Sequence, residues 1–502
     1  LRRGAWAEPV DEQRRWAFRP AVEPGARVEA GDWLGWVPEH HVRHHVMAPL
    51  ELPGPAVVTH VAPAGEYRVG EPVAALRTDD GREREVTMAQ RWPVKHAIDR
   101  YARRLYPAER LATGCRIIDT LFPIVRGGTA CVPGPFGAGK TVLQQLLARY
   151  AAVDVVIVVA CGERAGEVVE TIEELPSLRD PRTGGSLMDR TIIVCNTSSM
   201  PVAAREASIY TGITLAEYYR QLGLDVLVLA DSTSRWAQAM RETSGRLEEI
   251  PGEEAFPAYL RSRIAGVYER AGLVELRSGA TGALTLIGTV SPAGGNFEEP
   301  VTQATLGVVG AFHGLSRARS DQRRYPAIDP LDSWSLYAER IDDGDPAWVE
   351  ALAFFRQTLR RADEIGRMMA VVGEEGVPLR DLVVHLSGEL LDAAYLQQNA
   401  FDEVDACTPM TRQRDDLVRL HRALAAPLAL ADKAAARRFF AALTDAFYQR
   451  NYCATGSDAL AEHDRRIERL VAEATDPTLA PGPEPEANPE HEAQPEPERG
   501  AA

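Results

Sequence analysis

The sequence predicts an α/β protein with a parallel sheet at its centre, a β-rich segment before it and a helical segment after it. Short apolar runs at 128–133, 154–161, 191–196, 225–230 and 284–290 are separated by stretches with helical spacing. Strands that alternate with helices in this way are typical of a parallel sheet covered on both faces. A glycine-rich loop directly follows the first run and precedes a helical stretch. We therefore expect a ligand at the carboxyl ends of the strands.

Composition sets limits on the classes of function. The chain has 502 residues, of which 45% are hydrophobic and 25% charged, so it is long enough for about three domains. A net charge of −16 argues against nucleic acid as a partner, because a nucleic-acid binder presents a basic face. The six cysteines form no C-x-x-C pair and predict reduced thiols in a cytoplasmic protein. The apolar runs are too short to span a bilayer, and no signal peptide opens the chain.

Changes in local pattern predict four segments. Residues 1–95, rich in Pro, Gly and Val, predict a small β-rich domain, and 96–335 predict the α/β domain. Helical periodicity predicts a helical domain over 336–475, and the Pro/Glu-rich tail 476–502 predicts disorder. A histidine cluster at 40–45 lacks a carboxylate or cysteine at ligand spacing, which favours a solvated loop over a metal site.

The loop at 134–141 fits the G-x-x-x-x-G-K-[ST] spacing of a phosphate-binding loop. In this motif bare backbone amides surround a phosphate, the lysine reaches the outer phosphates and the threonine hydroxyl binds Mg²⁺. The helix expected after the loop would present its N-terminus to the phosphate. The sequence therefore predicts nucleotide binding by the loop and the residue after it: Gly134, Pro135, Phe136, Gly137, Ala138, Gly139, Lys140, Thr141 and Val142.

Polar residues follow other predicted strands of the same sheet. Glu163 and Arg164 come after the second strand, and Asp231 comes after the fourth. Alone, Glu163 could be a surface salt-bridge residue and Asp231 a helix N-cap. Beside a phosphate loop, the two carboxylates instead indicate a water-orienting group and a ligand for the magnesium shell. A further glycine-rich loop at 291–297 would allow close approach of backbone to a ligand.

Several long motifs resemble one family, the catalytic A subunits of the vacuolar and archaeal-type rotary ATPases. The matching stretches are GPFGAGKTV at 134–142, MPVAAREASIYTGIT at 200–214 and ADSTSRWA at 230–237, and the resemblance runs from about residue 8 to about 410. It implies a RecA-like P-loop NTPase core with an inserted β-rich domain at 1–95 and a C-terminal helical domain. The family's N-terminal barrel would precede Leu1, so we expect that residues are missing before the chain begins.

The resemblance also implies roles for particular residues. Lys140, Glu163 and Arg164 would be catalytic, with Glu163 orienting the attacking water. Thr141 and Asp231 would bind Mg²⁺ together with ATP or ADP. Arg235 would lie near the γ-phosphate, and the adenine would stack in a pocket that includes Tyr325 and Phe401. Three motifs depart from the family pattern: GERAGE at 162–167, SPAGGNF at 291–297, and YPAIDPLD at 325–332, which is more similar to the related F-type β subunit.

The resemblance implies an ATP-hydrolysing or ATP-synthesising subunit of a rotary proton or sodium pump. Its partners would be a B subunit, which alternates with it in an A3B3 hexamer and supplies an arginine finger, and the central-stalk and peripheral-stalk subunits. The chain would be cytoplasmic and would meet the membrane only through the complex. The alternatives are an export ATPase of a type III or flagellar system, a non-catalytic nucleotide-binding subunit, and an RNA translocase. The insert at 1–95 argues against the export ATPase, and the intact phosphate loop argues against the non-catalytic subunit. The acidic net charge argues against the RNA translocase.

Overall fold

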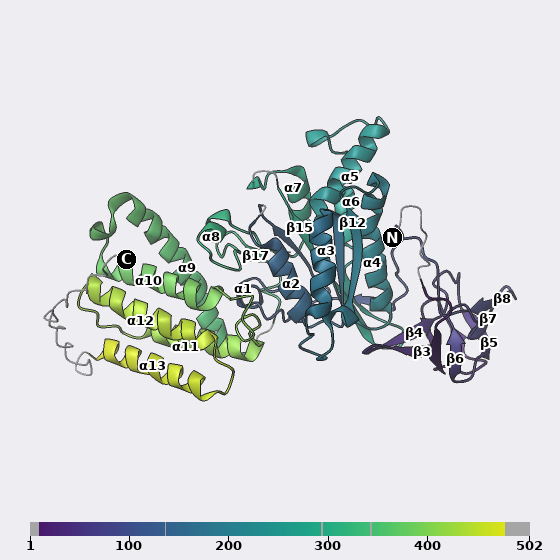
Figure 1. Cartoon of the computed structure of the whole chain (residues 1–502), viewed down its shortest axis with the longest axis horizontal. Helices are drawn as coiled ribbons and strands as arrows, with labels where there is room; N and C mark the ends of the chain where they lie inside the picture. Colours follow the sequence, from purple (N-terminus) through teal and green to yellow (C-terminus); the bar gives the residue numbers. More distant parts are fainter. Residues whose placement is uncertain (1–9, 136, 293–294, 342–343, 477–502) are drawn as a thin grey trace, which may run out of the picture.

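The computed structural model describes residues 10–135, 137–292, 295–341 and 344–476, and Figure 1 shows their arrangement. A β-rich unit lies at one end of an elongated molecule, a sheet covered by helices lies in the middle, and a bundle of helices lies at the other end. The predicted fold class is confirmed. Phe136 and Ala293 lie outside the described residues. The tail after Asp476 also lies outside them, and disorder is predicted for this tail alone.

The N-terminal unit is a pair of small antiparallel sheets. One sheet has the strand order β4-β3-β1-β6 and the other β2-β5-β7-β8. Their inward-facing residues, among them Phe18, Leu34, Val58 and Leu76, form one apolar core. The strands are β1 (Arg15–Pro20), β2 (Arg27–Val28), β3 (Trp33–Glu39), β4 (Val42–Met47), β5 (Ala56–Val61), β6 (Gly65–Arg68), β7 (Ala74–Thr78) and β8 (Glu83–Val86).

The histidine cluster takes part in joining this unit to the central domain. His44 Nδ1 lies 2.6 Å from Glu39 Oε2, and its Nε2 lies 2.8 Å from the hydroxyl of Tyr218 on helix α4 (Val202–Gln221). The ring of His45 stacks on Trp33, whose Nε1 donates to the Gln221 carbonyl at 3.1 Å. Among the described residues there is no group of three or more His, Cys, Asp or Glu that could hold a metal ion. The cluster is a packing contact between two units.

The central sheet has the strand order β12-β11-β13-β15-β10-β16-β17. The first six strands of this order run parallel to one another, and β17 pairs antiparallel to β16. Two further antiparallel strands, β14 and β9, extend the sheet from β15. The strands are β9 (Arg103–Leu105), β10 (Thr129–Pro133), β11 (Val155–Glu163), β12 (Thr191–Thr197), β13 (Asp225–Asp231), β14 (Gly272–Glu275), β15 (Thr281–Val290), β16 (Ala311–Phe312) and β17 (Trp334–Ser335).

Both faces of this sheet are buried, as the continuous apolar strands predict. Along β13, Leu227 and Leu229 face helix α2, while Val226 and Val228 pack in the cluster formed with α4, α5 and α6. The helices of this domain are α1 (Arg116–Leu121), α2 (Lys140–Tyr150), α3 (Ala165–Glu174), α4, α5 (Thr233–Arg246), α6 (Leu260–Tyr268), α7 (Pro300–Leu306) and α8 (Arg317–Asp321).

The C-terminal helices begin where the sequence provides N-caps. Asp345 precedes Pro346 and accepts from the Ala347 amide, and Asp432 and Ser457 cap two later helices in the same way. Leu143 and Leu147 of α2 belong to the same buried core as Trp348, Phe355 and Leu443 and other residues of this bundle. The bundle therefore packs against the phosphate-loop helix. Its helices are α9 (Pro346–Val372), α10 (Leu379–Leu391), α11 (Met410–Ala425), α12 (Lys433–Asn451) and α13 (Asp458–Thr475). No helix in the described parts of the chain is both long and apolar enough to cross a membrane.

Candidate nucleotide site

Four adjacent parallel strands end at the same edge of the sheet and place the predicted polar residues together. The strands are β11, β13, β15 and β10, in that spatial order. Glu163 ends β11, Asp231 ends β13, Ser291 follows β15, and the phosphate loop follows β10. Parallel strands require this convergence, because all of their carboxyl ends lie on one side.

The phosphate loop has the backbone shape that its glycines allow. Gly137 and Gly139 have φ of 80° and 85°, a region that residues with a side chain rarely adopt. A Cβ atom on Gly137 would meet no atom within 4 Å, so the space beside the loop is open. Helix α2 begins at Lys140, and no side chain caps its first turn. Its uncapped amides and positive helix end fit a phosphate.

The amino group of Lys140 is held at the mouth of the loop by oxygen acceptors. Its Nζ donates to the Gly134 carbonyl at 2.7 Å and to Ser291 Oγ at 3.0 Å. Burial lowers the pKa of Lys140, and the carboxylates of Asp231 and Glu163 oppose that shift. Ser291 was not predicted as a partner of Lys140. The glycines of its loop predicted close approach of backbone to a ligand, and nothing in the sequence indicated that the serine would contact the lysine.

Glu163 is buried at the end of β11 and paired with one guanidinium. Arg235 Nη1 lies 2.8 Å from Glu163 Oε1 and also donates to the Gly162 carbonyl at 2.6 Å. The other oxygen, Oε2, is buried and receives no hydrogen bond from the described residues. Burial raises the pKa of Glu163 to about 7, and the neighbouring carboxyls of Glu167 and Asp231 add to the shift. The side chain of Arg164, expected to position this carboxylate, is exposed, and the ion pair to Glu163 is made by Arg235.

Asp231 and Thr141 supply further oxygen atoms near Glu163. Asp231 Oδ1 accepts from Thr289 Oγ1 at 2.7 Å, and burial raises the pKa of Asp231. Both Asp231 and Thr141 line one small hollow together with Glu163 and Glu167. A hydroxyl and one or two carboxylates are the protein ligands that Mg²⁺ takes when phosphate oxygens and water complete its shell. This donor set therefore fits Mg²⁺ bound together with a nucleotide.

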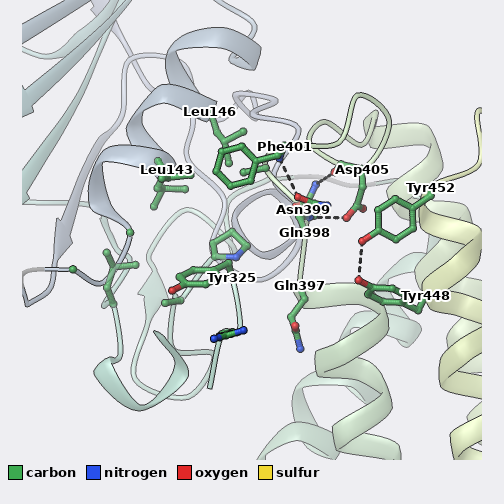
Figure 2. Close-up of a pocket in the computed structure, with 18 residues that line it drawn as sticks. Leu143, Leu146, Tyr325, Gln397, Gln398, Asn399, Phe401, Asp405, Tyr448 and Tyr452 are labelled. Carbon is green, nitrogen blue, oxygen red and sulfur yellow. Dashed lines mark hydrogen bonds between the residues drawn. The ribbon is translucent and has the colours of Figure 1, made fainter. Parts of the chain in front are cut away.

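A cavity of about 520 Å³ opens beside the phosphate loop (Figure 2). Gly137, Gly139 and Val142 line it on the loop side, and a Cβ atom on Gly139 would lie 3.6 Å from the Tyr325 ring. Tyr325 and Phe401, predicted for the adenine pocket, both line the cavity, and 89% of the Phe401 surface is exposed. An exposed aromatic ring of this kind is available to stack on a base.

The cavity has a second wall that sequence reasoning missed. The helical domain forms this wall. It contributes Asn399, from the segment that carries Phe401, and two tyrosines at the end of α12, Tyr448 and Tyr452. Helical periodicity predicted a helical domain over 336–475, and no motif singled out either tyrosine. Only the folded chain brings a position some 300 residues beyond the phosphate loop into the same cavity.

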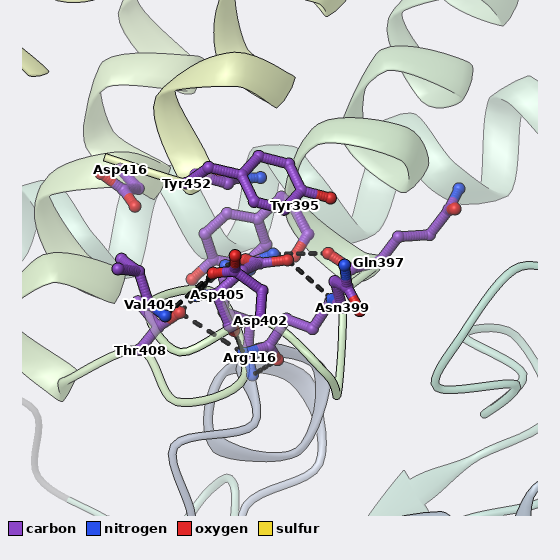
Figure 3. A network of polar contacts seen from close by, with 12 residues as sticks. Arg116, Tyr395, Gln397, Asn399, Asp402, Val404, Asp405, Thr408, Asp416 and Tyr452 are labelled. Carbon is purple, nitrogen blue, oxygen red and sulfur yellow. Dashed lines mark hydrogen bonds and ion pairs between the residues drawn. The ribbon is translucent and has the colours of Figure 1, made fainter. Parts of the chain in front are cut away.

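A buried arginine holds the segment that carries Asn399 and Phe401 (Figure 3). Arg116, on α1, is 1% exposed and lies 2.7 Å from Asp405 Oδ1 through its Nη1. The same guanidinium donates to Thr408 Oγ1 and to the carbonyls of Tyr395 and Gln397. Asp405 Oδ2 in turn accepts from the Asn399 amide at 2.7 Å. The ion pair therefore fixes the backbone from which one cavity wall is built.

Gln398 adds a direct connection to the base side of the cavity. Its backbone amide donates to the Tyr325 carbonyl at 2.8 Å, and its side-chain Nε2 donates to the Gly114 carbonyl at 3.0 Å. The Gln398 Oε1 accepts from the Arg116 amide at 2.6 Å. The backbone at Tyr325 and the segment that carries Phe401 thus belong to one hydrogen-bonded frame that includes Arg116.

The comparisons with known proteins agree with this geometry. The profile of the ATP synthase alpha/beta family, nucleotide-binding domain, matches residues 114–335. The barrel-sandwich domain of the ATP synthase alpha/beta subunit matches 7–95, and the C-terminal domain of V and A type ATP synthase matches 342–429. The chain belongs to the ATP synthase alpha/beta family of nucleotide-binding proteins.

Within that family the similar chains are V-type alpha chains. The chain is 58% identical to V-type ATP synthase alpha chain 1 of Treponema pallidum over 94% of its own length and 79% of that protein. It is 55% identical to the V-type ATP synthase alpha chain of Treponema denticola over 95% of its length and 80% of that protein. A solved ATPase from the type III secretion system of pathogenic bacteria has a TM-score of 0.54 over 64% of this chain and 89% of its own. At 23% identity this structure supports the fold alone.

Replacing Arg116 by methionine should destabilise the protein by about 3–5 kcal/mol, because Asp405 would remain buried without its counter-charge. The quantity to measure is the free energy of unfolding in urea, followed by circular dichroism. The matched control is Arg465→Met, whose pair with Glu462 lies on the surface and should change stability by less than about 0.5 kcal/mol. Equal, small effects of the two changes would show that the buried pair does not hold the segment.

Proposed function

We propose that this chain is the catalytic nucleotide-binding subunit of a V-type rotary ATPase, which couples ATP hydrolysis or synthesis to transport of protons or sodium ions. The observation that supports it best is the meeting of Lys140, Glu163 and Asp231 at one sheet edge beside the phosphate loop. Its relatives are named V-type ATP synthase alpha chains. We also propose domain limits near residues 95, 335 and 475, which follow the changes of element type.

In this proposal the loop places the phosphates and Lys140 absorbs their charge. Backbone amides at the start of α2 surround a phosphate, and the Lys140 amino group exchanges its contacts with Gly134 and Ser291 for the outer phosphate oxygens. Thr141 and Asp231 would hold Mg²⁺, which would neutralise charge on the phosphate oxygens. Tyr325 and Phe401 stack on the base.

Glu163 is proposed to orient the attacking water. Arg235 holds Oε1, which leaves Oε2 to accept a hydrogen bond from that water. The pKa of Glu163 is raised to about 7, so the carboxyl keeps its proton below that pH. In the protonated form it cannot take a proton from the water. Arg164 is proposed to act on the phosphates from its exposed position at the start of α3. Phosphoryl transfer of this kind depends mainly on placement and charge.

The proposal requires a partner for full activity. Stabilisation of the transition state by an arginine from a neighbouring subunit is worth about 10³–10⁵ in rate. We propose that the partner is a B subunit, alternating with this chain in an A3B3 hexamer. Stalk subunits connect the hexamer to the membrane sector. The chain itself is proposed to be cytoplasmic and peripheral to the membrane.

In the assembled complex, Glu163→Gln should lower turnover about 10²–10⁴-fold while nucleotide affinity is retained, because the amide can occupy the site but cannot serve as a base. Wild-type kcat/KM should rise as pH increases through about 7, when Glu163 loses its proton, and the variant should lose that rise.

Two variants serve as controls for this experiment. Glu167→Gln keeps the Glu163 carboxylate and should retain most of the turnover. Lys140→Ala should lose tight binding of Mg-ATP, measured by titration calorimetry. Near-normal turnover of Glu163→Gln together with a large loss in Glu167→Gln would transfer the role to Glu167.

The purified chain alone should bind ATP and hydrolyse it very slowly, because the transition-state arginine is expected from the neighbour. Adding the cognate B subunit should restore turnover, measured as phosphate release, and an arginine-to-alanine change at the B-subunit interface should remove it again. Turnover of several per second by a monomer verified by light scattering would mean that the site is self-sufficient, and the rotary assignment would lose its mechanistic basis.

A further inference from the structure

The cavity wall opposite the phosphate loop ends in a pair of tyrosine hydroxyls. Tyr448 lies on α12 and Tyr452 directly follows that helix, and both line the cavity with Asn399 (Figure 2). Their rings are edge to face with centroids 5.3 Å apart. Tyr448 is 43% exposed, so its hydroxyl can reach a bound molecule, whereas Tyr452 is partly buried behind it. Of the two phenol groups that line the cavity, the one of Tyr448 is therefore the more exposed.

The hydrogen bond between the two hydroxyls has a direction. The Tyr452 hydroxyl donates to the Tyr448 oxygen at 2.8 Å. Burial and the neighbouring Tyr448 raise the pKa of Tyr452 to about 12, against the lowering effect of the Asn399 side chain. The Tyr448 oxygen accepts this hydrogen bond and keeps its own hydrogen to donate.

That hydrogen of Tyr448 has no protein acceptor in the part of the chain that the structure describes. A hydroxyl at the edge of a ligand cavity, with its oxygen already engaged, acts as a directed donor. The matching ligand atom is an acceptor. A ligand group that presents an N–H at the same place would meet a hydrogen instead of a lone pair, which costs affinity.

The position of this donor indicates which part of a nucleotide it meets. The phosphates belong at Gly137 and Gly139, and a Cβ atom on Gly139 would lie 3.6 Å from the Tyr325 ring. Figure 2 shows Tyr325 and Phe401 on the same side of the tyrosine pair. A nucleotide with its phosphates in the loop and its base against those rings would direct the outer edge of the base toward Tyr448. At that edge adenine presents N1 as an acceptor, whereas guanine presents N1–H as a donor.

We propose that Tyr448 donates its hydroxyl hydrogen to N1 of the adenine ring and so favours ATP over GTP. The inference rests on the proposed function, because it requires a nucleotide in this cavity. It gives the helical domain a direct part in choosing the base. It also joins α12 to the phosphate-loop domain through the bound nucleotide.

The test compares wild type with Tyr448→Phe, which removes the hydroxyl and keeps the ring. Binding of Mg-ATP, Mg-GTP and the Mg²⁺ complexes of 1-deaza-ATP and 7-deaza-ATP to the purified chain is measured by titration calorimetry. Tyr448→Phe should weaken ATP and 7-deaza-ATP about 3–10-fold, the usual range for one neutral hydrogen bond, and leave GTP and 1-deaza-ATP unchanged. The matched control is Tyr106→Phe, a tyrosine that is 66% exposed outside the cavity lining, which should leave all four affinities unchanged.

Each outcome decides one question. If wild type binds ATP and Tyr448→Phe keeps the same ratio of ATP to GTP affinity, the inference is wrong while the proposed function stands. If 7-deaza-ATP, and not 1-deaza-ATP, abolishes the effect of the change, the contact to N1 is wrong. If wild type binds neither ATP nor GTP, the proposed function fails and the inference fails with it.

Discussion

The buried ion pair between Arg116 and Asp405 is the contact on which the shape of the nucleotide cavity depends. A guanidinium that is 1% exposed must have its charge and its N–H groups satisfied by the protein. Asp405, Thr408 and two backbone carbonyls do this, and all of them lie beyond residue 390. Satisfying one arginine of α1 therefore fixes a loop of the helical domain over the phosphate-loop domain. The apolar core shared between α2 and the bundle keeps the two parts in register.

The charged groups at the edge of the sheet are buried by the strands that end there. Glu163, Asp231 and Lys140 are drawn out of water by the strands that end there, and burial shifts the pKa of each toward its neutral form. The two carboxylates oppose the shift of Lys140, and Lys140 opposes the shift of Asp231, whereas Asp231 adds to the shift of Glu163. Arg235 holds one oxygen of Glu163 and leaves the other without a protein donor. A site of this kind is poised to accept phosphate charge, Mg²⁺ and a water molecule, each of which offsets part of the desolvation.

Sequence reasoning recovered the parts of the site that local patterns encode. The apolar runs located all five predicted strands, and parallel strands must bring Glu163, Asp231 and the phosphate loop to one edge. It did not find Ser291, Tyr448 or Tyr452, because their roles depend on tertiary contacts across as many as 300 positions. The sequence did not predict a role for Arg116 either, since a single arginine in an apolar stretch does not indicate a partner near residue 405. The position of Arg164 is a further difference: strand β11 buries Glu163 and exposes the residue after it.

Hydrogen exchange with mass spectrometry tests most directly whether the two domains form one nucleotide site. The full chain is compared with and without a non-hydrolysable Mg-ATP analogue, with Lys140→Ala as the control that should show no change. The account predicts slower amide exchange both in the phosphate loop at 134–141 and in the segment at 397–405, because the nucleotide contacts both walls of the cavity. Protection of the loop with unchanged exchange at 397–405 would contradict it.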